Sequence, residues 1–114
     1  MLTIDALRQY GANTKEGLSR CMNNEAFYLR VVGMSLDDPN FEKLSSAIEK
    51  DDRKEAFEAA HALKGVLGNL ALTPAYDLAA EVTELLRSSE EADYPAYLDR
   101  ILEQRDTLLA LRDS

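Results

Sequence analysis

The chain has 114 residues, of which 46% are apolar and 30% are charged, a balance that predicts one globular domain over residues 1–114. Its net charge of −8 argues against nucleic acids and anionic membranes as partners, because both attract a basic surface. The single cysteine, Cys21, excludes an intramolecular disulfide and a multi-cysteine zinc site.

The start of the chain has no basic segment followed by an apolar run, as a signal peptide would. No apolar stretch approaches the roughly 20 residues that a membrane-spanning helix needs. Together with the low cysteine content, these features predict a cytoplasmic protein.

Helical spacing dominates the sequence, and runs of β-branched residues are missing. We expect a short helix over residues 3–10 that ends near Gly11, and a second over 14–22 with Thr14 as its cap. Cys21 is expected to be a buried residue of this second helix, without a redox role.

A third helix is expected over residues 23–36, beginning at an asparagine cap. Pro39 then interrupts the pattern, because proline lacks a backbone donor and restricts the residue before it. A further helix follows over 41–50. The apolar residues that share a face are Phe27, Val31 and Met34 in the first of these helices and Phe41, Leu44 and Ile48 in the second.

The longest helical pattern covers residues 51–72, with Asp51 or Asp52 as its cap. It ends at Thr73, which is a cap candidate for the next helix, while Pro74 suits that helix's first turn.

Two more helices are expected over residues 75–87 and 94–112, joined by the polar connector 88–93. Their inward residues are Leu78, Val82 and Leu85 or Leu86 in the first, and Leu98, Ile101, Leu102, Leu108 and Leu109 in the second. Because the connectors are short, neighbouring helices should be antiparallel. The prediction is an all-α fold, an up-down bundle of four long helices with one or two additional short N-terminal helices.

His61 is the only histidine, and helical spacing of about 100° per residue places it away from the apolar face. The predicted core face consists of Ala56, Ala59, Leu63, Val66, Leu67 and Leu70. The face that contains His61 consists of Lys54, Phe57, Glu58, Lys64, Gly65, Gly68 and Leu72. We therefore expect an exposed imidazole rather than a core histidine.

Gly65 and Gly68 share the face of His61, although a glycine inside a helix costs roughly 1 kcal/mol relative to alanine. Two such costs on one face indicate that space beside the ring is being kept for a partner. The alternative is close packing of one glycine against a neighbouring helix, and a solvent-exposed histidine without a role is the corresponding alternative for His61.

Lys64 lies one helical turn from His61, where its ammonium group can reach an anion held on the ring. A neutral imidazole is a suitable nucleophile near pH 7, because histidine ordinarily titrates at about pH 6.5. Attack on a phosphoryl group would give an N–P bond. Phe57 is a candidate for a docking patch, or else it fills a groove between helices.

The stretch "AHALKGVLGNLAL" resembles the motif of the histidine-containing phosphotransfer (HPt) domain, approximately His-x-Leu-Lys-Gly with a small residue three positions further on and an apolar pair after it. The matching residues are His61, Leu63, Lys64, Gly65 and Gly68. The resemblance extends from about residue 14 to residue 112 and implies a four-helix bundle with an exposed histidine.

The resemblance implies that His61 is phosphorylated on its outer ring nitrogen and exchanges the group with an aspartate of a response-regulator receiver domain. Lys64 would then lie near the phosphoryl group, and Gly65 and Gly68 would leave room for the receiver. A histidine kinase, often a hybrid one, is the other implied partner, and the family expectation is a monomer. The chain would be a phosphoryl carrier rather than an enzyme, with no cofactor of its own, since the receiver supplies Mg²⁺ and the acidic pocket.

Two positions depart from the family pattern. Ala71 stands where the family often has glycine, and Val66 stands where a small polar residue is common. Both are expected to face the core, where the methyl group of Ala71 would tighten the packing, so neither removes a reacting group.

Three other functions are alternatives to a phosphoryl carrier. Glu58 and His61 have the spacing of a metal-binding bundle, but such sites need two inward-facing motifs. A kinase dimerisation domain usually has an acidic residue directly after its histidine, where this chain has Ala62. The third alternative is a helical interaction module that binds a receiver or kinase without being phosphorylated.

Overall fold

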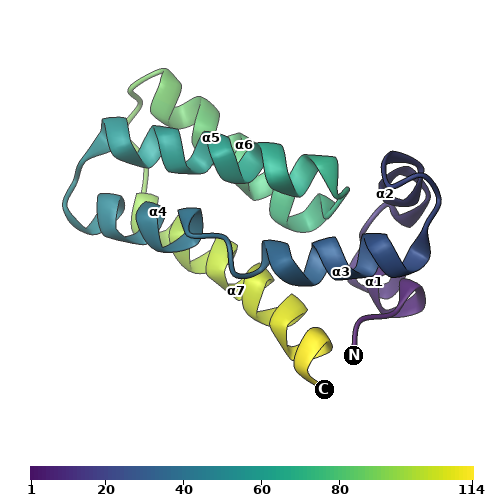
Figure 1. Ribbon diagram of the computed structural model, residues 1–114. Helices are drawn as coiled ribbons and strands as arrows, with labels where there is room; N and C mark the ends of the chain where they lie inside the picture. The colour runs from purple at the N-terminus through teal and green to yellow at the C-terminus, as the bar shows by residue number, and fades with distance from the viewer.

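The computed structural model describes residues 1–114 as seven α-helices without strands (Figure 1), which confirms the predicted all-α fold. The helices are α1 (Ile4–Tyr10), α2 (Thr14–Arg20), α3 (Glu25–Ser35), α4 (Asn40–Glu49), α5 (Arg53–Asn69), α6 (Thr73–Arg87) and α7 (Tyr94–Asp113). No helix combines the length and the apolar character that a membrane crossing requires.

Side-chain caps set most of the helix starts. Thr3, Asn13, Asn24, Asp52 and Asp93 each accept a hydrogen bond from a backbone N–H in the first turn of the following helix. The two threonines predicted as caps are instead the first residues of their helices. Asn13, rather than Thr14, caps α2. The hydroxyl of Thr73 donates to the carbonyl of Ala71, and α6 has no side-chain cap.

The four later helices form the main packed unit. In sequence order each packs against the next, and α7 returns to contact α4. In Figure 1, α5 and α6 lie side by side above α4 and α7. Their fully buried residues include Leu44, Leu63, Leu67, Val82, Ile101 and Leu108. Because α5 buries one face in this way, its other face is left for the site.

Three helices precede α4: the two short ones, α1 and α2, and α3, which matches the helix expected over residues 23–36. The third of them, α3, buries Tyr28, Val32 and Ser35, while Phe27 and Met34 are 37% and 66% exposed. Two of the three residues predicted for the apolar face of this helix therefore lie outward, and only Val31 packs partly against the core. The opposite face, which carries Tyr28, is buried instead. Neighbouring elements accommodate both the ring and the hydroxyl of Tyr28.

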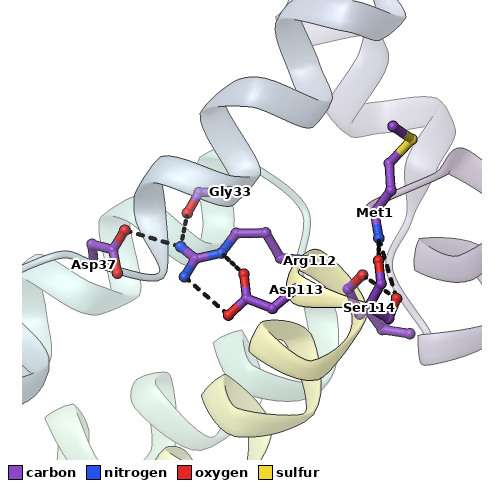
Figure 2. A network of polar contacts seen from close by, with 7 residues as sticks. Met1, Gly33, Asp37, Arg112, Asp113 and Ser114 are labelled. Carbon is purple, nitrogen blue, oxygen red and sulfur yellow. Dashed lines mark hydrogen bonds and ion pairs between the residues drawn. The ribbon is translucent and has the colours of Figure 1, made fainter.

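Arg112 near the end of α7 fastens α3 to the rest of the molecule. Its guanidinium donates to the carbonyl of Gly33 at 3.1 Å and to Asp37 at 2.9 Å. Figure 2 shows this network, together with the nearby contact between the amino group of Met1 and the carbonyl of Ser114. The end of α7 thus binds both the C-terminal end of α3 and the first residue of the chain.

Candidate functional site

His61 lies near the middle of α5 and is exposed, whereas Ala60 and Leu63 beside it are fully buried. The predicted outward orientation is therefore confirmed. Neither ring nitrogen forms a hydrogen bond with a protein group, so no neighbouring side chain is placed to act as a general base. The geometry offers a free imidazole on a rigid helix.

The imidazole instead stacks on Phe57, one helical turn earlier. The two ring centroids are 5.7 Å apart and the ring planes differ by 7°. The guanidinium carbon of Arg87, at the end of α6, lies 5.2 Å from the centroid of Phe57. Phe57 is half-buried between these groups, so it is not an open apolar patch.

A depression of about 580 Å³ adjoins His61 between α2, α5 and α6. The residues that line it include Glu16, Arg20, Lys64, Gly65, Tyr76 and Asp77. Lys64 is half-buried and lies one turn beyond His61, as the sequence predicts. The surface is thus polar and carries both signs of charge close to the imidazole.

Arg20 brings the N-terminal region to this depression. It donates to the carbonyl of Gly68 at 2.6 Å and also pairs with Glu16. No local pattern in the sequence indicates a role for Arg20, because its partner is 48 positions away. Arg87 and Tyr76 could not be selected from the sequence either, because only the packing of α6 against α5 brings them to the site.

The two glycines of the motif have different surroundings. A β-carbon added to Gly65 would have no atom within 4 Å, so this position leaves open space next to His61. One added to Gly68 would lie 2.9 Å from Cε1 of Tyr76. Close packing, the alternative considered for one of the glycines, therefore accounts for Gly68.

The end of α5 departs from the helical-wheel prediction. The helix stops at Asn69, so Leu72 turns inward and is fully buried instead of lying beside His61. Ala71 is buried, but its φ of 57° is left-handed, a conformation that favours glycine. The substitution of the family's glycine therefore affects backbone conformation rather than packing. Val66 is half-buried against the core.

The residues considered for a metal do not converge. Glu58 pairs with Lys43 at 3.8 Å. No group of three histidine, cysteine or acidic side chains is arranged to hold an ion. Cys21 is buried directly after α2, where it ends the helix rather than lying within it.

In a comparison with known families, the family model of the Hpt domain matches residues 38–114. This segment contains α4 to α7 and the whole stretch from Phe57 to Gly68. Searches of curated proteins and of solved structures returned no match. The matched segment leaves out α1, α2 and α3, and with them Arg20.

Proposed function

Because the chain belongs to the Hpt domain family, which comprises the phosphotransfer modules of two-component signalling, we propose that His61 carries the phosphoryl group. One observation supports this assignment above all others. The only histidine of the chain is exposed in the middle of α5, without a hydrogen-bonded protein partner and beside the open surface at Gly65.

In the proposed reaction, the lone pair of the outer imidazole nitrogen attacks the phosphorus of a receiver's aspartyl phosphate. The new N–P bond forms as the P–O bond breaks, and the electron pair stays on the aspartate carboxylate. The imidazole releases its proton to solvent. The reverse sequence returns the group to a receiver aspartate, so His61 works in both directions.

The receiver supplies Mg²⁺ and the acidic pocket, since positioning and charge neutralisation carry most of the catalysis in phosphoryl transfer. This chain supplies the acceptor and is therefore a phosphoryl carrier. Lys64 offers a cation within one helical turn of the bound group. Gly65 lets the backbone of the partner approach the ring, and Gly68 contributes indirectly by seating Tyr76.

The proposal extends to the architecture and the partners. We take residues 1–114 as a single domain whose helices α4 to α7 form an up-down four-helix bundle. The partners are a receiver domain and a histidine kinase, including a hybrid one. The monomeric state and the cytoplasmic location expected from the sequence are part of the same proposal.

The test is phosphoryl transfer from phosphorylated receiver domains of the same organism. We expect a mass gain of one phosphoryl group that is acid-labile and base-stable, and none in His61→Gln. His61 is exposed, so this variant should keep the thermal stability of the parent. A folded protein that takes no label from any receiver or kinase would favour the interaction module instead.

A further inference from the structure

The orientation of the His61 ring has one visible cause. The ring stacks on Phe57, and Phe57 is in turn covered by Arg87. We infer that Phe57 is a positioning residue for His61 and that Arg87 keeps Phe57 in place. This inference rests on the proposed function and replaces the docking role first considered for Phe57.

The stack follows from helix geometry. Residues four apart lie on one face of a helix, and side chains tilt towards its N-terminus, so His61 leans over Phe57. The centroid distance of 5.7 Å with nearly parallel planes is an offset stack, a favourable arrangement for two aromatic rings. The contact is therefore built into α5 itself.

Arg87 adds a connection to the neighbouring helix. Its Nε atom lies 3.2 Å from a carboxylate oxygen of Glu84, and its guanidinium lies over the ring of Phe57. A cation over an aromatic face is attracted by the ring quadrupole. The chain Glu84, Arg87, Phe57 and His61 thus runs from α6 to the reacting ring.

Face stacking suits the chemistry of the imidazole. A phosphoryl group attaches in the plane of the ring, at its edge, whereas Phe57 contacts the face. Stacking consequently restricts rotation of the ring without blocking the nitrogen. A ring held in one orientation spends more time aligned with the incoming phosphorus, which is the benefit of positioning in catalysis.

A docking role and a positioning role predict different kinetics. Docking requires a protein partner, so it affects only transfer from the receiver. Positioning affects every phosphoryl donor, including one too small to dock. Phosphoramidate is such a donor, because the imidazole attacks its phosphorus while the P–N bond breaks and the nitrogen leaves as ammonia with the imidazole proton.

The experiment compares Phe57→Leu with Phe57→Tyr as the conservative control. We expect Phe57→Leu to slow phosphorylation by phosphoramidate, and by saturating receiver, by the same factor of roughly three to ten. The receiver concentration at half-maximal rate should be unchanged. Phe57→Tyr keeps a stacking ring and should retain the parent rates.

Two further measurements keep the inference testable if a variant loses stability. Arg87→Met should slow both donors by a smaller factor than Phe57→Leu, whereas Arg87→Lys keeps the cation and should have little effect. In NMR spectra, the imidazole C–H resonances should lie upfield in the parent and move downfield in Phe57→Leu as the ring current is lost. Thermal unfolding of each variant checks that the fold is retained.

Several results would overturn the inference. If Phe57→Leu leaves the phosphoramidate rate unchanged and raises only the half-saturating receiver concentration, Phe57 is a docking residue. Unchanged rates with both donors would remove any role. If the parent protein accepts no phosphoryl group from either donor, the proposed function fails as well. That result differs from one in which the parent and Phe57→Leu are phosphorylated at the same rate, which contradicts only the role of Phe57.

Discussion

The hydroxyl of Tyr28 donates a hydrogen bond of 2.8 Å to the backbone carbonyl of Leu70, 42 positions later in the chain. Leu70 directly follows α5, where backbone carbonyls lack partners within the helix. Tyr28 is fully buried in α3, outside the segment that matches the Hpt family. The N-terminal region therefore completes the end of the helix that carries His61.

Removing this hydroxyl should destabilise the protein. Tyr28→Phe keeps the ring but leaves the buried carbonyl of Leu70 without its partner, so we expect the free energy of unfolding to fall by about 1–3 kcal/mol. Urea denaturation measures the change. Tyr97→Phe is the matched control, because the hydroxyl of Tyr97 bonds Glu81 at the exposed surface and its loss should cost under about 0.5 kcal/mol. Equal losses in both variants would contradict the assignment.

Two buried tyrosines should make stability sensitive to alkaline pH. Burial raises the pKa of Tyr10 from 10.0 to about 12, and it does the same for Tyr28, with a further increase from the charge of Cys21. A pKa that is higher in the folded state gives a contribution that is complete below pH 10 and lost as pH rises towards 12.

We therefore expect the free energy of unfolding to fall across this interval, by up to about 1.4 kcal/mol per pH unit for a fully buried group such as Tyr28. Urea denaturation at several alkaline pH values gives the slope. In Tyr28→Phe and Tyr10→Phe the slope should be smaller than in the parent. Lysines also titrate in this pH range, but they do so in all three proteins and therefore do not affect the comparison. A slope that neither substitution reduces would show that other groups cause the loss.

The two glycines of the site should respond oppositely to alanine. Gly65→Ala adds a methyl group in open space and should raise helix stability by roughly 1 kcal/mol, while slowing transfer from a receiver that approaches this surface. Gly68→Ala drives a β-carbon against Tyr76 and should lower stability by about 1–3 kcal/mol relative to Gly65→Ala. Thermal unfolding and receiver transfer rates measure the two effects.

The role of Tyr76 can be isolated by a double-mutant cycle. In a Tyr76→Ala background the obstructing ring is gone, so Gly68→Ala should no longer destabilise the protein. If the penalty of Gly68→Ala persists without the ring, the close contact between the two residues is not its cause.

Replacing Ala71 by glycine should stabilise the protein. Its φ of 57° costs an L-residue roughly 1–2 kcal/mol. Part of the gain is offset by the greater freedom of glycine in the unfolded chain, so Ala71→Gly should stabilise by about 0.5–1 kcal/mol. Ala80→Gly, in the middle of α6, should instead destabilise by about 1 kcal/mol. Chemical denaturation of the two variants gives the comparison, and a loss in both would exclude relief of strain at residue 71.

Local rules predicted much of this molecule from its sequence. The order of the helices, the stop at Gly11, the break at Pro39 and the exposure of His61 all follow from residues close together in the chain. Helical periodicity separates an apolar face from a polar one, and caps and prolines mark the ends. The candidate acceptor and its neighbour Lys64 could be selected because both lie on one polar face of one helix.

Tertiary packing decided the rest, because it depends on residues from different helices. From the sequence, Phe57 and Gly68 could each serve a partner or pack against a neighbouring helix, and in the structure Arg87 and Tyr76 of α6 occupy the space beside them. In α3 two faces are apolar enough to be buried, and the bond from Tyr28 to a distant carbonyl favours one of them. Periodicity along one helix determines where its faces lie, and only the neighbouring helices determine what each face meets.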